Sequence, residues 1–175
     1  MTPNGLDELH VLGEYWHRDE RRRTDLGMLI HAAKDQQQAT AAERLAEKIV
    51  ALAPAVVDPA APVLVAAVPS NPAPTVHLPG VLAQALAMAG WGDWADDLIE
   101  RRTPTPSLRD VEPADRLEMA RAAGYTVGPI GPGTTVVLVD DVVLTGTTLS
   151  HVAGCLRIAG ATRVIGVVAA RSRRG

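Results

Sequence analysis

The sequence VVLVDDVVLTGTTL, residues Val136 to Leu149, decides the fold of this 175-residue chain. The apolar run at its start is typical of a strand buried on both faces, and it ends in Asp140 and Asp141. A turn rich in glycine and hydroxyl residues follows, and it leads into a helix predicted from about Thr147 to Ala159. The stretch therefore predicts a strand, a turn and a helix, with two carboxylates where the strand ends.

Two more apolar runs have the same character, at residues 63–68 and 164–170, and residues 98–102 are predicted to form a short further strand. Segments with helical periodicity precede the first of these runs, at residues 24–53, and follow it, at residues 80–89. Buried strands separated by helices are typical of βαβ units. The predicted fold class is α/β, with a central parallel sheet flanked by helices on both faces and a ligand at its carboxyl edge.

The first part of the chain is predicted to be helical. Thr24 is a helix-start signal, and Thr40 with Glu43 forms a capping-box pattern ahead of a second helix. Residues 6–23 are predicted to be helical and partly exposed. We interpret residues 1–23 as an N-terminal extension of the domain.

The turn from Thr145 to Thr148 has the chemistry of an anion site. Gly146 lets the backbone approach a ligand closely, and the N–H groups around it can converge on a phosphate at the positive end of a helix. The pair Asp140-Asp141 can accept hydrogen bonds from two adjacent hydroxyls. A phosphate at one end and a diol at the other suit a sugar phosphate. The alternative is an Asp-Asp turn that caps an ordinary helix.

Composition limits the function classes. A net charge of −3 argues against a general nucleic-acid binder, and a single cysteine excludes an internal disulfide framework or a cysteine zinc site. No apolar run approaches the roughly 18 residues of a membrane span, and no basic stretch leads into an apolar segment at the N-terminus. We expect a soluble, cytoplasmic protein of one domain, residues 1–175, that binds no membrane.

The basic residues are unevenly spread. Of the 17 cationic residues only Lys34 and Lys48 are lysines, and none lies between Lys48 and Arg101. Any phosphate handled by that middle stretch must be held by backbone N–H groups, by hydroxyls, or by basic residues that arrive from elsewhere in the fold.

The stretch quoted first resembles the loop that binds 5-phosphoribosyl 1-diphosphate (PRPP) in the type I phosphoribosyltransferases. The resemblance implies that Asp140 and Asp141 are catalytic and take the ribose 2′- and 3′-hydroxyls, while the turn wraps the 5′-phosphate. The residues implied to bind PRPP are Asp140, Asp141, Leu144, Thr145, Gly146, Thr147 and Thr148. Mg²⁺ would be carried by PRPP, with no direct protein ligand.

Outside this loop the chain resembles the ComF (competence protein F) family over roughly residues 26–171, without the N-terminal zinc module of that family. The resemblance implies that Ser70 and Asn71, in the loop after the first apolar run, hold the pyrophosphate. This loop contains no arginine here.

The resemblance also implies a small mobile hood over about residues 98–130. Its Arg101 and Arg102 are expected to bring positive charge to the site, together with Arg109 and Arg116.

Two functions are compatible with these residues. The first is a phosphoribosyltransferase that uses PRPP and Mg²⁺ to transfer the 5-phosphoribosyl group to a nitrogen acceptor, a nucleobase or a related compound. The alternative is a non-catalytic protein that binds PRPP or nucleotides, or a ComF-like DNA-uptake (competence) protein with single-stranded DNA as partner. The sequence leaves the oligomeric state open, and a homodimer, the commonest closed assembly, is compatible with either function.

Other side chains receive structural interpretations. We interpret His77 as an exposed loop histidine, and Trp91 and Trp94 as cover for an edge of the core. Cys155 is interpreted as a small buried side chain.

Overall fold

The computed structural model describes residues 2–17, 22–52, 61–70, 74–102 and 124–172. Its main sheet has the strand order β1-β7-β6-β2-β3, and every neighbouring pair is parallel. The strands of this sheet are β1 (Glu8–Glu14), β2 (Val63–Ala67), β3 (Asp93–Trp94), β6 (Thr135–Val143) and β7 (Arg163–Arg171). The predicted α/β class with a central parallel sheet is confirmed.

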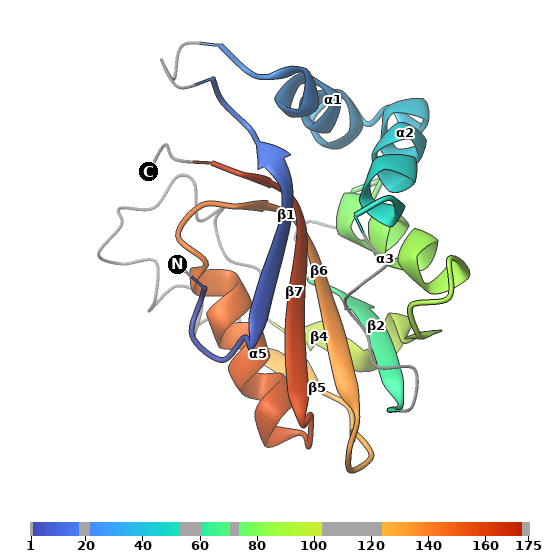
Figure 1. The fold of residues 1–175 in the computed structure, drawn as a ribbon, viewed down its shortest axis with the longest axis vertical. Helices are drawn as coiled ribbons and strands as arrows, with labels where there is room; N and C mark the ends of the chain where they lie inside the picture. Colours follow the sequence, from blue (N-terminus) through green and yellow to red (C-terminus); the bar gives the residue numbers. More distant parts are fainter. Residues whose placement is uncertain (1, 18–21, 53–60, 71–73, 103–123, 173–175) are drawn as a thin grey trace.

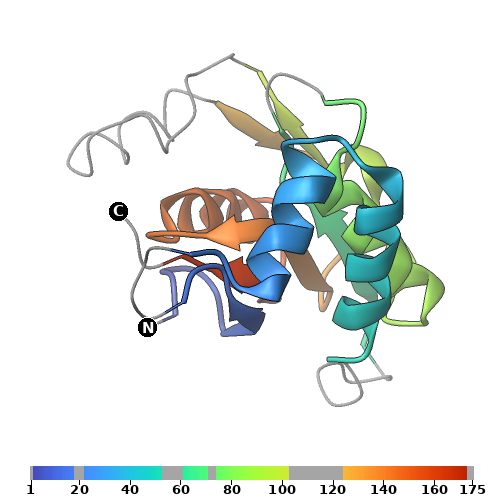
Figure 2. The same cartoon turned by 90° about the horizontal axis from the view of Figure 1, so that it is seen from above.

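Helices cover both faces of this sheet (Figures 1 and 2). On one face lie α1 (Asp25–Lys34), α2 (Ala39–Val50) and α3 (Leu78–Met88), with α2 packed against both of its neighbours. The other face is covered by α5 (Thr147–Ile158). Both layers are built on side chains that alternate along the strands.

A second, smaller sheet lies on the α5 side. It consists of β4 (Ile99–Arg101) and β5 (Tyr125–Val127), which pair antiparallel, and a short 3₁₀ helix (Asp96–Leu98) precedes it. The sheet contributes Ile99 to the core on the α5 side. These strands are the described ends of the expected hood segment, because residues 103–123 lie outside the described residues.

The position of β6 between two helical layers explains why residues 136–139 are all apolar rather than alternately apolar and polar. Val137 and Val139 pack into the core under α1–α3, whereas Val136 and Leu138 pack into the core under α5, and all four are fully buried. A strand between two helical layers presents no face to water, so each position must be apolar. The pairing of β6 with β2 and with β7 puts the ends of all three strands at one edge.

The prediction for residues 6–23 was wrong, because this segment contains β1 rather than a helix. β1 pairs parallel with β7, from Glu8 opposite Ile165 to Glu14 opposite Arg171. Leu9 packs where Gly166 of β7 has no side chain; a Cβ there would lie 2.9 Å from the Leu9 Cδ1. The strand owes its conformation to this distant partner.

The two helix-start signals had different outcomes. The prediction for Thr24 is confirmed, since its Oγ1 accepts a hydrogen bond of 2.9 Å from the Gly27 backbone N–H at the start of α1. The capping box of Thr40 and Glu43 was wrong, because α2 begins earlier, and its N-cap residue is Gln38, which makes no side-chain capping bond.

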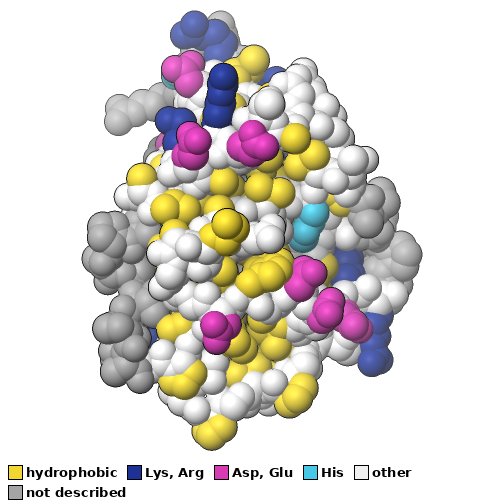
Figure 3. Space-filling model, turned by 90° about the vertical axis from the view of Figure 1, so that its right-hand side faces the viewer, with side chains coloured by type: hydrophobic (Ala, Val, Ile, Leu, Met, Phe, Trp, Pro, Cys, Tyr) yellow, Lys and Arg dark blue, Asp and Glu magenta, His cyan; other side chains and the backbone are white. Residues whose placement is uncertain are grey.

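Helix α3 carries no acidic or basic residue, and Met88 at its end is 84% exposed. Figure 3 shows apolar side chains gathered on the side of the molecule where α2 and α3 lie. Trp91, which follows α3, is buried, and Trp94 packs against the same core, as predicted. None of the helices that the structure describes is long and apolar enough to cross a membrane.

Candidate functional site

The two candidate carboxylates lie within β6 rather than after it, because the strand continues to Val143. Asp141 is only 3% exposed and is directed toward α1, whereas Asp140 is half-buried and its charge acts on Tyr125, on the α5 side. Neighbouring residues of an extended strand point to opposite faces of the sheet. The carboxylates therefore flank the end of the strand from its two sides.

Both carboxylates are fixed by backbone hydrogen bonds. Asp140 Oδ1 accepts from the Asp141 N–H at 2.8 Å, and Asp141 Oδ1 accepts from the Val142 N–H at 2.6 Å. A carboxylate held in this way keeps its orientation without help from a ligand. The strand end thus presents two oriented hydrogen-bond acceptors.

The turn after β6 has the backbone conformation and the hydroxyl groups that suit the binding of an anion. Gly146 has φ +78°, a left-handed conformation, and serves as the N-cap of α5 without any side-chain capping bond. The hydroxyls of Thr145 and Thr147 lie 2.8 Å apart on the open side of the turn. The N–H groups at the start of α5 point toward this turn, where the helix dipole favours an anion.

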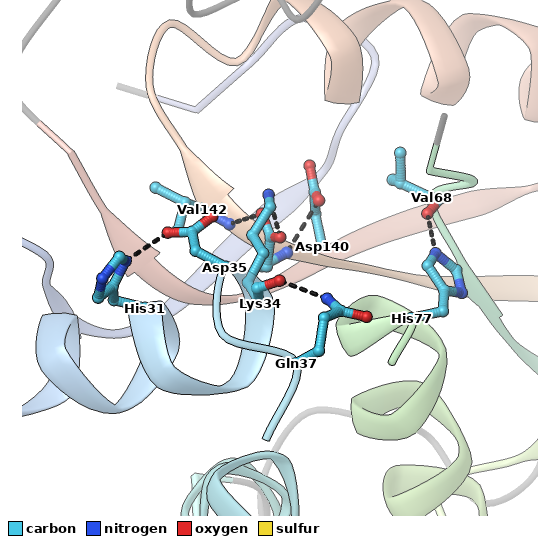
Figure 4. A network of polar contacts seen from close by, with 9 residues as sticks. His31, Lys34, Asp35, Gln37, Val68, His77, Asp140 and Val142 are labelled. Carbon is cyan, nitrogen blue, oxygen red and sulfur yellow. Dashed lines mark hydrogen bonds and ion pairs between the residues drawn. The ribbon is translucent and has the colours of Figure 1, made fainter. Parts of the chain in front are cut away.

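The sequence analysis missed one residue of the site, Lys34 in the last turn of α1. Its ammonium group forms an ion pair with Asp141 Oδ2 (Figure 4). Lys34 is about one third exposed, while the carboxylate that it contacts is almost completely buried. The uneven spread of basic residues was the available signal, since basic residues from elsewhere in the fold were one of the ways to hold a phosphate beside that stretch.

Gln37 joins the end of α1 to the loop that follows β2. Its Nε2 donates to the Lys34 carbonyl, and its Oε1 accepts from the Val76 N–H at 2.7 Å. Gln37 is the only described residue other than glycine with a positive φ, +54°. The connection holds Lys34 and the loop in one arrangement at the end of β6.

His77 is not the exposed loop histidine that we expected. Its ring is half-buried, and its Nε2 lies 3.1 Å from the Val68 carbonyl, at the end of β2 (Figure 4). Because a carbonyl only accepts, this nitrogen carries the proton. Burial lowers the pKa of His77, and the bond to Val68 opposes that effect.

This lowered pKa predicts that acid destabilises the protein through His77. The unfolded chain takes up the proton near pH 6.5, where the folded protein still resists it, so the free energy of unfolding falls as the pH drops below about 6.5. In His77→Gln the amide can still donate to Val68 but does not titrate. We expect urea unfolding at pH 7.5 and 5.5 to show a larger loss of stability in the wild type than in this variant. Equal losses would contradict the assignment.

The remaining predicted residues are partly placed. Val68 extends the pairing with β6 by donating its N–H to the Val139 carbonyl at 2.8 Å, which brings Ser70 to the same edge as the carboxylates. Asn71 lies outside the described residues. Leu144 is half-buried at the start of the turn, and the next residue, Thr145, is exposed.

The expected hood arginines belong to the small sheet or border it. Arg101 of β4 lies opposite Tyr125 of β5, with its guanidinium 5.8 Å from the ring centre, while Arg102 follows β4 and is exposed. Burial raises the pKa of Tyr125. Arg109 and Arg116 lie outside the described residues.

The described residues contain no group of three or more histidine, cysteine, aspartate or glutamate side chains that could hold a metal ion. Cys155 is half-buried on α5, and burial raises the pKa of its thiol. A thiol with a raised pKa is a poor nucleophile at neutral pH. The chemistry of the site therefore rests on carboxylates, hydroxyls, backbone N–H groups and one lysine.

These features define the class of protein: an α/β fold of the type I phosphoribosyltransferase kind, with its candidate site at the carboxyl edge of a parallel sheet. Residues 95–175 match the sequence model of the phosphoribosyl transferase domain family. The matched residues include β4 to β7 and the turn at the start of α5. No curated protein and no solved structure matches the chain.

Proposed function

We propose that the chain binds PRPP and transfers its 5-phosphoribosyl group to a nitrogen acceptor of the nucleobase kind. The observation that carries the proposal is the end of β6, where two fixed carboxylates meet an uncapped helix start. Asp140 and Asp141 would accept hydrogen bonds from the ribose hydroxyls, and the turn around Gly146 would hold the 5′-phosphate. The matched family supports phosphoribosyl transfer as the type of reaction.

In this reaction the acceptor nitrogen forms a bond to C1 of the ribose. The bond between C1 and the diphosphate oxygen breaks, and its electron pair leaves with the diphosphate. The role of the protein is to hold the sugar at both ends while positive charge develops on its ring. Asp140 and Asp141, near the ring, favour that charge.

Mg²⁺, when bound, would neutralise the diphosphate. It usually keeps several waters and binds through substrate phosphates with few protein ligands. We expect the reaction to take place in the cytoplasm.

The test of the proposal is calorimetric titration of PRPP with Mg²⁺ into the wild type and into Asp140→Asn/Asp141→Asn. The amides keep the shape of the side chains but lose charge, so binding should weaken at least about tenfold for each lost charged hydrogen bond. The wild type should bind with micromolar to millimolar affinity. Wild-type protein that shows no heat at concentrations able to detect a millimolar constant would refute the proposal.

A second candidate is a protein that binds PRPP or nucleotides without turnover. The observation in its favour is that the loop after β2 and the whole of α3 contain no basic residue. Release of diphosphate in the presence of Mg²⁺ and a panel of bases separates the candidates, because only the enzyme produces it. For the DNA-uptake alternative, binding of single-stranded DNA should weaken steeply with added salt.

A further inference from the structure

The diphosphate end of the proposed ligand needs positive charge, and the segment from the end of β2 to the start of α3 does not supply it. The loop between β2 and α3 and the start of α3 lie beside Asp141, and neither contains Lys or Arg. The charges that act on His77, in this loop, are those of Asp141, Asp96 and Lys34. Among the residues that the structure describes, Lys34 is the cation that contacts Asp141 at this end of the site.

Lys34 also covers the carboxylate that the proposed function assigns to the ribose. Asp141 has one oxygen on the Val142 N–H and the other on the Lys34 ammonium, and only 5% of its side chain is exposed. A ribose hydroxyl reaches this carboxylate only if the ammonium moves. Lys34 can move, because it is about one third exposed and its stem is flexible.

We propose that Lys34 is the diphosphate-binding cation of the site, supplied by α1 from outside the segment that matches the family. In the empty site it neutralises Asp141. When PRPP binds, the ribose takes over the carboxylate and the ammonium turns to the diphosphate. This inference rests on the proposed function.

The surroundings of Lys34 support this role. Gln37 accepts from the Val76 N–H and donates to the Lys34 carbonyl, which fixes the backbone of Lys34 against the loop after β2. Next to Lys34, the carboxylate of Asp35 already has a partner, because its Oδ2 lies 2.6 Å from Nδ1 of His31. The backbone is therefore held while the ammonium group can exchange one anion for another.

Two ligands distinguish this role from a structural one. PRPP carries the diphosphate, whereas ribose 5-phosphate carries only the sugar and its phosphate. In Lys34→Gln we expect PRPP to bind at least about tenfold more weakly than to the wild type. Ribose 5-phosphate should bind as well as to the wild type or more tightly, because its hydroxyls no longer compete with the ammonium group for Asp141. Lys34→Arg should keep most of the preference for PRPP. Lys48→Gln, which removes the other lysine at an exposed position on α2, should change neither affinity.

A second measurement needs no variant. Acetylation of the wild type by acetic anhydride, followed by mass spectrometry, reports on Lys34 with Lys48 as internal reference. Lys34 should react faster with ribose 5-phosphate bound than with PRPP bound, while Lys48 reacts equally. Equal reactivity of Lys34 in both complexes, or equal weakening of both ligands in Lys34→Gln, would overturn the role of Lys34. Failure of the wild type to bind either ligand would refute the proposed function itself.

Discussion

Replacing Gly146 by alanine should reduce the affinity for ribose 5-phosphate by about tenfold or more without unfolding the sheet. Gly146 has φ +78°, where alanine is strained by about 1–2 kcal/mol. The new Cβ would also lie 2.5 Å from Pro3 Cγ, so the turn must shift. Because the N–H groups of this turn are proposed to hold the phosphate, a shift removes their convergence. Calorimetric titration with ribose 5-phosphate measures the effect.

Gly133 provides the matched control for this prediction. It has the same φ of +78°, precedes β6 at the opposite edge of the sheet, and has open space where a Cβ would be added. Gly133→Ala should therefore lose comparable stability in urea unfolding and leave the ligand affinity within about twofold of the wild type. Equal losses of affinity in both variants would show that the turn around Gly146 has no special part in binding.

Replacing Gly27 by alanine should destabilise the protein by about 2 kcal/mol or more, although alanine is the better helix former. Gly27 lies in the first turns of α1, and an added Cβ would be 2.0 Å from the Tyr15 carbonyl oxygen. The two nearest atoms belong to the Tyr15 backbone, which cannot yield as the end of a flexible side chain can, so α1 must move away. The same movement displaces Lys34 and should weaken PRPP binding.

The control for this variant is Gly154→Ala, in the middle of α5. A Cβ at Gly154 meets nothing within 4 Å, so only helix propensity acts, and this variant should gain up to about 1 kcal/mol. In urea unfolding, the free energy of unfolding should therefore fall in Gly27→Ala and rise in Gly154→Ala. A stabilised Gly27→Ala would mean that α1 does not pack on the β1–α1 connection as described.

The parts of the fold that the sequence predicts well are those specified by local pattern. β6 and β7 are runs of apolar residues buried on both faces, and their length and the glycine-containing turns beside them favour strands. The start of α1 follows from the hydroxyl of Thr24, which makes the capping bond expected of it. These features depend on neighbours in the sequence.

Strand β1 could not be predicted in this way. Its residues are all half-buried, so they show no clear alternation of apolar and polar positions. Leu9 packs in the space above Gly166, more than 150 positions later in the sequence. The conformation is set by that distant partner, which the local sequence does not reveal.

In the candidate site, too, the residues that are contiguous in sequence could be predicted, and those that other elements bring to the site could not. The carboxylates and the turn of β6–α5 are contiguous in sequence, and the structure brings them together at the sheet edge. Lys34 and His77 reach the same edge on other elements, and single residues of these kinds carry no pattern. The lack of basic residues between Lys48 and Arg101 left a cation from elsewhere in the fold as one possibility, without indicating which residue would supply it.

The pairing of β1 with β7 has a consequence for how the chain is made. Synthesis on the ribosome proceeds from the N-terminus, so β1 emerges early and its partner emerges more than 140 residues later. Until then, the edge of β1 has no neighbour and is open to pairing with other chains. Strand β7, which lies between β1 and β6, completes the described sheet, and we expect nascent chains stalled before Arg163 to depend on chaperones that shield β1.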